Sequence, residues 1–252
     1  MKKTLLATAL LGMLSVSSAH AATVVGFKVG GDYWDADTSG SFNSDDGVAQ
    51  TYNYESKSQG SLWVAFEHPI PLVPNIKIRE NRLEGKGTQN GSDFDFNGVG
   101  FRPNNPGDEY STSVINDLSN TDFVLYYEIL DNDLVALDLG AAYKQMHGSL
   151  RVQDSAKPSE VDLDSGIVMV YASAEVGVPG LGLYAFADVM LGVDETSVYD
   201  YNAGLGWKFD GVALDTAVRV GYREFNFDVD DFSSTTQNMS FKGAFAGVEL
   251  AF

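Results

Sequence analysis

The sequence predicts an all-β protein, a single-chain antiparallel transmembrane β-barrel with short periplasmic turns and longer outer loops. Three observations support this prediction. The chain begins with a pattern typical of an export signal, most of the remainder alternates apolar and polar residues, and the last segment ends on Phe252. Alternation with a period of two is expected of strands that face lipid on one side and a polar lumen on the other.

Residues 1–21 have the pattern of a cleaved secretory signal peptide. Lys2 and Lys3 form a positive start, residues 4–16 are apolar, and an A-x-A pattern ends at Ala21. This apolar stretch is shorter than the roughly 20 residues that a membrane-spanning helix needs. We therefore expect cleavage after Ala21 and a single barrel domain over residues 22–252.

Charge and composition exclude several classes of protein. The net charge is -19, and loss of the two lysines of the signal segment, which contains no acid, shifts it to -21. Such an acidic chain lacks the basic surface that nucleic acids require. The chain has no Cys for a lipid anchor or a disulfide, and after the signal it has no run of 18 apolar residues that would form a spanning helix. A soluble β-sandwich and an outer-membrane barrel remain.

The distribution of charge along the alternation favours the barrel. In residues 134–147 apolar residues alternate with a set that includes Asp138 and Lys144, and in residues 212–227 they alternate with a set that includes Arg219 and Arg223. A soluble sandwich would rarely carry charges on one face and an unbroken apolar band on the other. Lipid outside and a polar lumen inside explain both faces.

We expect about ten strands, although the periodicity leaves eight or twelve open. The third strand is the weakest, because Ile76 and Ile78 are followed by Glu80 and Arg82. The expected strands are residues 23–34, 58–68, 75–86, 119–129, 134–147, 165–177, 182–194, 197–208, 212–227 and 239–252.

An even number of strands places both ends of the barrel on the periplasmic side, and the connections then alternate in length. The expected periplasmic turns are short, at residues 69–74, 130–133, 179–181 and 210–211. The expected outer loops are longer, at residues 35–57, 87–118, 148–164 and 228–238, with only Glu195 and Thr196 forming a tight outer turn.

Aromatic residues fall at the two ends of the expected strands, where their rings would lie at the two membrane–water interfaces. The outer set is Tyr33, Tyr143, Tyr199 and Tyr222, and the periplasmic set is Phe66, Trp207 and Phe252.

The segment VGFKVGGDYW at residues 25–34 resembles the first strand of an uncharacterised family of proteobacterial outer-membrane β-barrels with a Gly-Gly pair, here Gly30 and Gly31. The resemblance continues through residues 63–69 and 74–76 to Phe252. It implies an outer-membrane location and a barrel fold, and it implies no particular activity.

Charged residues dominate the expected lumen. A ten-stranded barrel is roughly 20 Å across, so long side chains from opposite walls nearly meet. The sequence therefore allows two interpretations, a lumen filled by ion pairs and a narrow pore for ions or small solutes. The residues expected to point inward are Asp32, Glu67, Asp122, Glu128, Asp138, Glu175, Asp188, Asp200, Asp215 and Glu249, together with Lys28, Lys77, Arg79, Lys144, Lys208, Arg219 and Arg223.

The first outer loop contains a near match to a calcium-binding loop. Asp35, Asp37 and Ser39 occupy ligand positions 1, 3 and 5, Gly40 follows, and Asp46 takes the place of the usual bidentate Glu. Strands rather than helices flank the segment. We interpret residues 35–46 as a solvated acidic loop without a metal site, and a calcium site stays open as the alternative.

Catalytic patterns are weak. His147 and Ser149 lie on one strand face at the outer rim, a relation that resembles the His and Ser of outer-membrane lipid A deacylases. An omptin-like protease would also fit ten strands, but no Asp-x-His motif is present, and acid pairs such as Asp45-Asp46 and Asp230-Asp231 fit solvated loops. We therefore expect no enzymatic activity, no catalytic residue and no cofactor, and we keep an outer-leaflet lipid hydrolase as an alternative.

The expected function is that of an integral outer-membrane barrel with a structural or surface-interaction role. The expected partners are outer-membrane lipid and lipopolysaccharide. The barrel-assembly machinery is a further expected partner, because a terminal Phe252 preceded by the apolar alternates Val248 and Leu250 resembles the C-terminal insertion signal of outer-membrane barrels.

Deletion of Phe252, or Phe252→Asp, should leave the protein exported but poorly assembled in the outer membrane, because the insertion signal is lost. Membrane fractionation and heat-modifiable gel migration measure this outcome. Normal surface assembly of both variants would refute the interpretation of the C-terminus.

Overall fold

The computed structural model describes residues 25–44, 47–105, 107–132, 134–211 and 214–252, so the expected signal peptide lies outside the described residues. Every regular element in these ranges is a strand, and no helix in them is long and apolar enough to cross a membrane. The strands are β1 (Gly26–Ser44), β2 (Gln50–Thr51), β3 (Asn53–Tyr54), β4 (Lys57–Glu67), β5 (Asn75–Arg82), β6 (Glu84–Asn90), β7 (Phe94–Phe96), β8 (Val99–Phe101), β9 (Ser111–Asp117), β10 (Asn120–Asp131), β11 (Val135–Met146), β12 (Gly148–Gln153), β13 (Pro158–Leu163), β14 (Gly166–Gly177), β15 (Leu183–Gly192), β16 (Tyr199–Phe209), β17 (Asp215–Phe232) and β18 (Thr235–Ala251).

Ten strands close into an antiparallel barrel. The order around the barrel is β1-β4-β5-β10-β11-β14-β15-β16-β17-β18, and β18 pairs again with β1. All ten expected strands are confirmed. The C-terminal residue takes part in the closure, because the backbone N–H of Phe252 donates to the carbonyl of Phe27 at 2.9 Å. The closed sheet has no free edge within the barrel.

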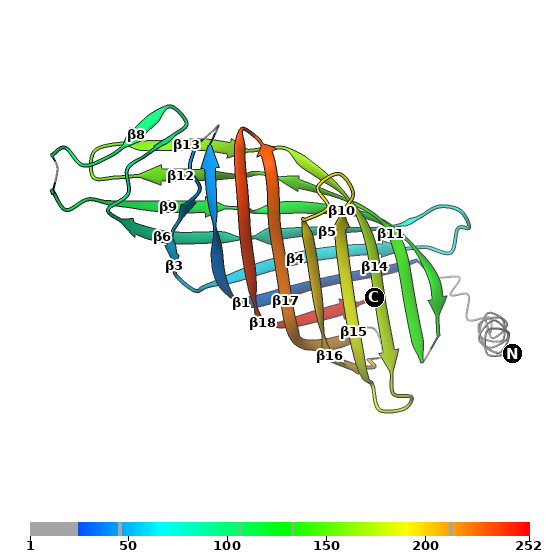
Figure 1. Ribbon diagram of the computed structural model, residues 1–252. Coiled ribbons are helices and arrows are strands. Elements are labelled where there is room, and N and C mark those ends of the chain that lie inside the picture. Colours follow the sequence, from blue (N-terminus) through cyan, green and yellow to red (C-terminus); the bar gives the residue numbers. More distant parts are fainter. Residues whose placement is uncertain (1–24, 45–46, 106, 133, 212–213) are drawn as a thin grey trace, which may run out of the picture.

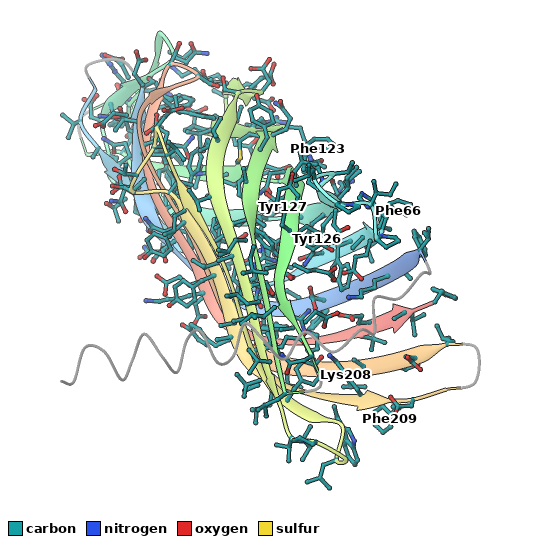
Figure 2. The ribbon with its side chains drawn as sticks, turned by 90° about the vertical axis from the view of Figure 1, so that its right-hand side faces the viewer. Phe66, Phe123, Tyr126, Tyr127, Lys208 and Phe209 are labelled. Carbon is teal, nitrogen blue, oxygen red and sulfur yellow. The ribbon has the colours of Figure 1, made fainter. Side chains whose placement is uncertain are left out.

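The two faces of the barrel wall differ as the alternation predicted. On β10, Phe123 and Tyr127 are 46% and 45% exposed on the outer surface, whereas Tyr126 between them points inward and is 3% exposed (Figure 2). The exposed outward band carries the aromatic residues expected at its ends, including Tyr33 and Phe66. An apolar exterior around a polar interior is the arrangement of a transmembrane barrel of the outer-membrane type.

The outer connections are longer than the periplasmic turns, as expected, but much of their length is regular strand. β6, β9, β12 and β13 continue the barrel strands β5, β10, β11 and β14 beyond the membrane, and β3 joins them in a five-stranded sheet. On the other side of the barrel, β1, β17 and β18 extend without a break, so part of the expected loop at 35–57 and most of that at 228–238 are strand. We call this extension the head; it lies at the end of the barrel opposite the C-terminus (Figure 1).

The β17–β18 hairpin explains why residues 228–238 fold so tightly. Phe232 pairs with Thr235, and the two residues between them, Ser233 and Ser234, have φ angles of 52° and 61°. Positive φ at both central residues gives the turn whose twist matches a strand pair. Only Ser233 and Ser234 therefore form the turn, and most of the eleven residues expected as a loop at 228–238 are strand.

The head contains an apolar core. Inward alternation continues from the barrel, but the inward residues change from charged to aromatic and aliphatic. On β17 and β18, Phe225, Phe227 and Phe241 have no exposed surface, and Phe227 packs edge-on against Phe232 with ring centroids 5.3 Å apart. The opposite sheet, its connections and the β7–β8 hairpin contribute further buried residues, which include Tyr52, Leu83, Phe94, Phe96, Phe101, Val114, Leu118, Leu150, Val152 and Leu163.

Phe227→Ala should destabilise the head by about 3–5 kcal/mol, because it removes a fully buried ring from a packed core. Hydrogen exchange of β17 and limited proteolysis of the folded protein in detergent measure the change. Asp228→Ala, at the next and partly exposed position, is the control and should have little effect. Equal protection of the head in both variants would contradict the assignment of Phe227 to its core.

Candidate functional site

Five charged side chains form a cluster across the middle of the lumen. Arg79 donates through Nε to Asp122 Oδ2 at 2.9 Å and through Nη2 to Asp200 Oδ2 at 2.7 Å. Arg223 donates to both oxygens of Asp200, at 2.9 and 2.7 Å. Lys144 Nζ lies 2.7 Å from Asp122 Oδ1 and 3.5 Å from Asp200 Oδ2. We call these residues the central cluster.

The strand register brings these residues together. Asp122 on β10 pairs directly with Arg79 on β5 and with Lys144 on β11, so three adjacent strands carry one row of alternating charge. Asp200 on β16 and Arg223 on β17 come from the opposite wall. Contacts of Asp200 with Arg79 and Lys144 therefore link the two walls across the lumen.

The cluster is closed to solvent. Asp122, Lys144 and Asp200 have no exposed side-chain surface, and those of Arg79 and Arg223 are 7% and 4% exposed. Buried charges persist only where partners neutralise them and satisfy their hydrogen bonds. Two asparagine side chains provide further hydrogen bonds to the cluster. Asn81 donates to Asp122, Asn81 accepts from Arg223, and Asn120 accepts from Lys144.

Aromatic rings seal the cluster on its sides. The guanidinium of Arg223 lies 4.8 Å from the ring centre of Trp34, and Lys144 Nζ lies 5.0 Å from that of Phe225. A cavity beside Arg79 and Arg223 has a volume of only about 10 Å³. That space holds about one water molecule.

A second layer of cations and rings lies beside the central cluster. Arg219 Nη2 donates to Asp188 Oδ2 at 3.1 Å, and its guanidinium lies 4.0 Å from the ring centre of Phe186. Lys77 Nζ lies 4.7 Å from the ring centre of Trp63. This layer narrows the lumen further by pairing each cation with a carboxylate or an aromatic face.

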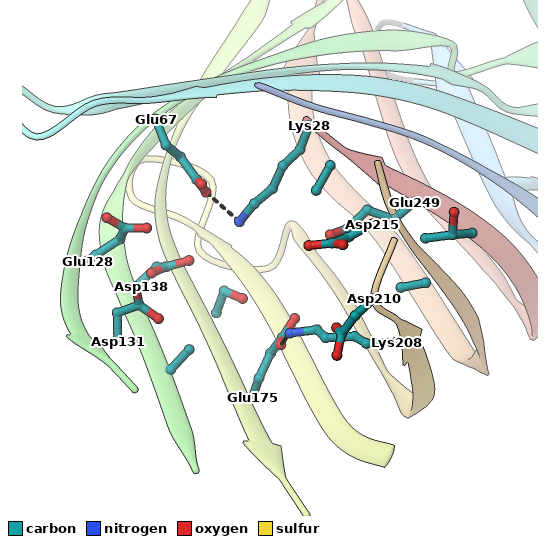
Figure 3. A pocket seen from close by; sticks show the side chains of 15 residues that line it. Lys28, Glu67, Glu128, Asp131, Asp138, Glu175, Lys208, Asp210, Asp215 and Glu249 are labelled. Carbon is teal, nitrogen blue, oxygen red and sulfur yellow. Dashed lines mark hydrogen bonds and ion pairs between the residues drawn. The ribbon is translucent and has the colours of Figure 1, made fainter. Parts of the chain in front are cut away.

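The periplasmic end of the lumen opens into an acidic cavity of about 280 Å³. Lys28 Nζ donates to Glu67 Oε1 at 2.7 Å and Lys208 Nζ to Glu175 Oε2 at 2.7 Å (Figure 3). These two lysines face eight carboxylates, so the cavity has an excess of negative charge. The carboxylates belong to Glu67, Glu128, Asp131, Asp138, Glu175, Asp210, Asp215 and Glu249.

The residues expected to point into the lumen from parity occupy the central cluster, the second layer or the acidic cavity, with Asp32 beside the small cavity next to Arg79. The arrangement of those charges into a closed central bridge and an acidic periplasmic cavity was not predicted. Trp34 is a further lumen residue that was not among those expected, although it lies two positions beyond Asp32 on the inward face.

The segment that resembles a calcium loop is not a loop. Residues 35–44 belong to β1 and pair with β18, and residues 35 and 36 pair with β4 as well. An extended strand holds Asp35, Asp37 and Ser39 in a row instead of around a cation. In the described residues no group of three or more His, Asp or Glu side chains is placed to hold a metal ion. Asp45 and Asp46 lie outside the described residues.

His147 and Ser149 lie at the junction of barrel and head, as expected, but each contacts a different acid. His147 Nε2 lies 3.3 Å from Glu80 Oε2, whereas the Ser149 hydroxyl donates to Glu160 Oε1 at 2.7 Å. A nucleophilic serine requires a base within hydrogen-bond reach of its hydroxyl. In the described part of the chain, the hydroxyl of Ser149 makes no hydrogen bond to His147.

No protein-family model and no curated protein sequence matches this chain, so membership of the Gly-Gly family stays a prediction. Solved structures of other barrels are similar over most of the chain at low identity. A FadL homologue of Pseudomonas aeruginosa is 9% identical with a TM-score of 0.37 and covers 90% of each chain. The transport unit of the autotransporter AIDA-I from Escherichia coli is 9% identical with a TM-score of 0.37, over 98% of this chain and 96% of that one. Ail of Yersinia pestis is 10% identical with a TM-score of 0.31, over 90% and 99%.

Asp200→Asn should lower the free energy of unfolding by about 3–5 kcal/mol, because it leaves three buried cations with one carboxylate. Urea unfolding in detergent, followed by tryptophan fluorescence, measures this loss. Lys144→Met in the Asp200→Asn background should restore part of it by removing one unpaired cation.

Glu175→Gln is the matched control, since it removes a carboxylate from a more exposed pair with Lys208 and should cost less than about 1 kcal/mol. Equal losses for Asp200→Asn and Glu175→Gln would refute the structural role of the central cluster.

Proposed function

We propose that this protein is a closed barrel of the outer membrane that holds the head rigidly at the cell surface and does not conduct solutes. The observation that carries the proposal is the contact of the buried Asp200 with cations of both walls across the middle of the lumen. The proposal includes export by the segment 1–21 and location in the outer membrane.

The geometry supports a pore less well. A pore needs a continuous polar path, and two barriers lie in series along this lumen. The first is the central cluster with its adjoining cavity of about 10 Å³. The second is the apolar core of the head, where Leu83, Leu118 and Phe225 are at most 1% exposed. Both barriers favour an acidic periplasmic cavity that ends within the barrel.

The head suits a structural or surface-interaction role. Its strands continue those of the barrel wall, so any force or contact on the head is passed to the barrel through hydrogen-bonded strands. Its core is packed with aromatic side chains, which keeps its surface in one conformation. A binding surface of fixed shape avoids the entropic cost of ordering loops.

The lipid hydrolase has weaker support, because the Ser149 hydroxyl is directed to Glu160 and His147 to Glu80. Under the proposal His147→Ala changes no lipid-directed activity. Release of fatty acid from outer-leaflet lipid by the unaltered protein, with loss of that release in His147→Ala, would replace the proposal with the hydrolase.

The refolded protein should give no steady conductance steps in planar bilayers, because both barriers close the lumen. The double variant Arg79→Ala with Arg223→Ala should also stay closed, since it removes part of the first barrier and leaves the core of the head in place. A general porin inserted by the same procedure is the positive control.

Heat-modifiable gel migration shows that each sample is folded. Reproducible unitary steps from the unaltered, folded protein would overturn the closed barrel and favour the narrow pore.

A further inference from the structure

The lipid-facing surface contains an apolar groove of about 650 Å³ across β17, β18, β1, β4 and β5. It forms because small outward residues, Gly31, Gly60 and Ala246, lie between larger ones. Tyr33 and Leu62 border it and are 62% and 70% exposed. The groove is therefore a depression in the part of the wall where acyl chains are the surrounding solvent.

Charged side chains mark the end of the groove nearest the head. Arg82 and Glu80 line this end, and Arg82 Nε lies 3.2 Å from Glu80 Oε1. The side chain of Arg82 is 78% exposed, and Glu80 is the only carboxylate that contacts it among the described residues. A guanidinium in this state retains N–H groups directed to its surroundings, and these match the oxygens of a phosphate.

Further cations lie immediately beyond the groove. Glu84 and Lys86 follow Arg82 on the same face, and Lys57 of the neighbouring strand contacts Glu84. The side chains of Lys57 and Lys86 are 40% and 51% exposed. Asp35 and Asp37 also face outward on β1 beyond the groove, so the charge there is mixed. Arg82 is the cation that lines the groove itself, and it is therefore the one best placed to contact a ligand in the groove.

We propose that this groove binds a phosphorylated lipid of the outer leaflet, with acyl chains along Gly31, Gly60 and Ala246 and a headgroup phosphate on Arg82. The apolar depression and the exposed guanidinium are aligned in the order in which such a lipid presents its chains and its phosphate. The shape of the groove fits acyl chains. Arg82 lies at the end of the groove nearest the head, which is the side where the headgroups of the outer leaflet lie.

Native mass spectrometry of the detergent-extracted protein, titrated with lipid A that carries both phosphates, tests the proposal. Arg82→Gln should weaken binding at least about tenfold, because charge-assisted hydrogen bonds to the phosphate are lost. Gly60→Leu should weaken it similarly by filling the groove. A side chain at position 60 fits the fold, since an added Cβ meets no atom closer than Asp32 O at 3.8 Å.

Matched controls separate these effects from a general change of surface. Arg102→Gln removes an exposed arginine of the head that also pairs with carboxylates, and Ala141→Leu enlarges a small outward residue on β11, away from the groove. Both controls should bind lipid A as the unaltered protein does. Heat-modifiable migration shows that every variant is folded.

Lipid A without phosphates should bind the unaltered protein at least about tenfold more weakly, with no further effect of Arg82→Gln. Equal binding of phosphorylated lipid A by all variants would overturn the proposal. Loss of binding in Gly60→Leu but not in Arg82→Gln would overturn the phosphate contact, and a dimer that Gly60→Leu dissociates would assign the groove to a second copy of the chain. Conductance stays independent of these results, so this test and the test of the closed barrel can fail separately.

Discussion

The structure depends on one constraint, which is that charges directed into a ten-stranded barrel must be neutralised by other side chains within the lumen. Asp200 pairs with Arg223 of the neighbouring strand and with Arg79 and Lys144 of the opposite wall. The cavity that adjoins Arg79 and Arg223 has room for only about one water molecule, so these charges depend mainly on one another. The same contacts that make the buried charges tolerable fill the bore and connect its walls.

The head solves a related problem by a different means. Its strands leave the membrane and could have ended in solvated loops, but their inward positions carry Phe225, Phe227 and Phe241, which are fully buried. Burial of such rings stabilises the extended strands and closes the outer end of the lumen in one step. Ion pairs and an apolar core therefore follow one another along the barrel axis, and an acidic cavity lies at the periplasmic end.

The outer surface of the barrel is under a different constraint. Its apolar side chains face lipid and need no charged partners, and acyl chains can fill gaps between them. Small residues such as Gly60 and Ala246 leave a groove there that in the lumen would have to be filled. Arg82 borders this groove at the end nearest the head, where an exposed charge can meet headgroups and water. This placement also explains why β5 has the weakest alternation in the sequence, because its outward face passes from Ile78 to Glu80 at the membrane boundary.

The sequence alone determined the inward and outward faces and the identity of the lumen charges, because a side-chain period of two is a local property of any strand. It predicted about ten strands and left eight or twelve open, and the closed pairing of β18 with β1 decided the number. Only the tertiary structure decided which charges meet. Asp200 and Arg79 are 121 residues apart, and their contact depends on the register of strands across a closed ring. It also decided that residues 35–44 and 228–238 are mostly strand. Their acidic, turn-like composition indicates a loop until the burial of distant rings such as Phe227 favours the extended pairing.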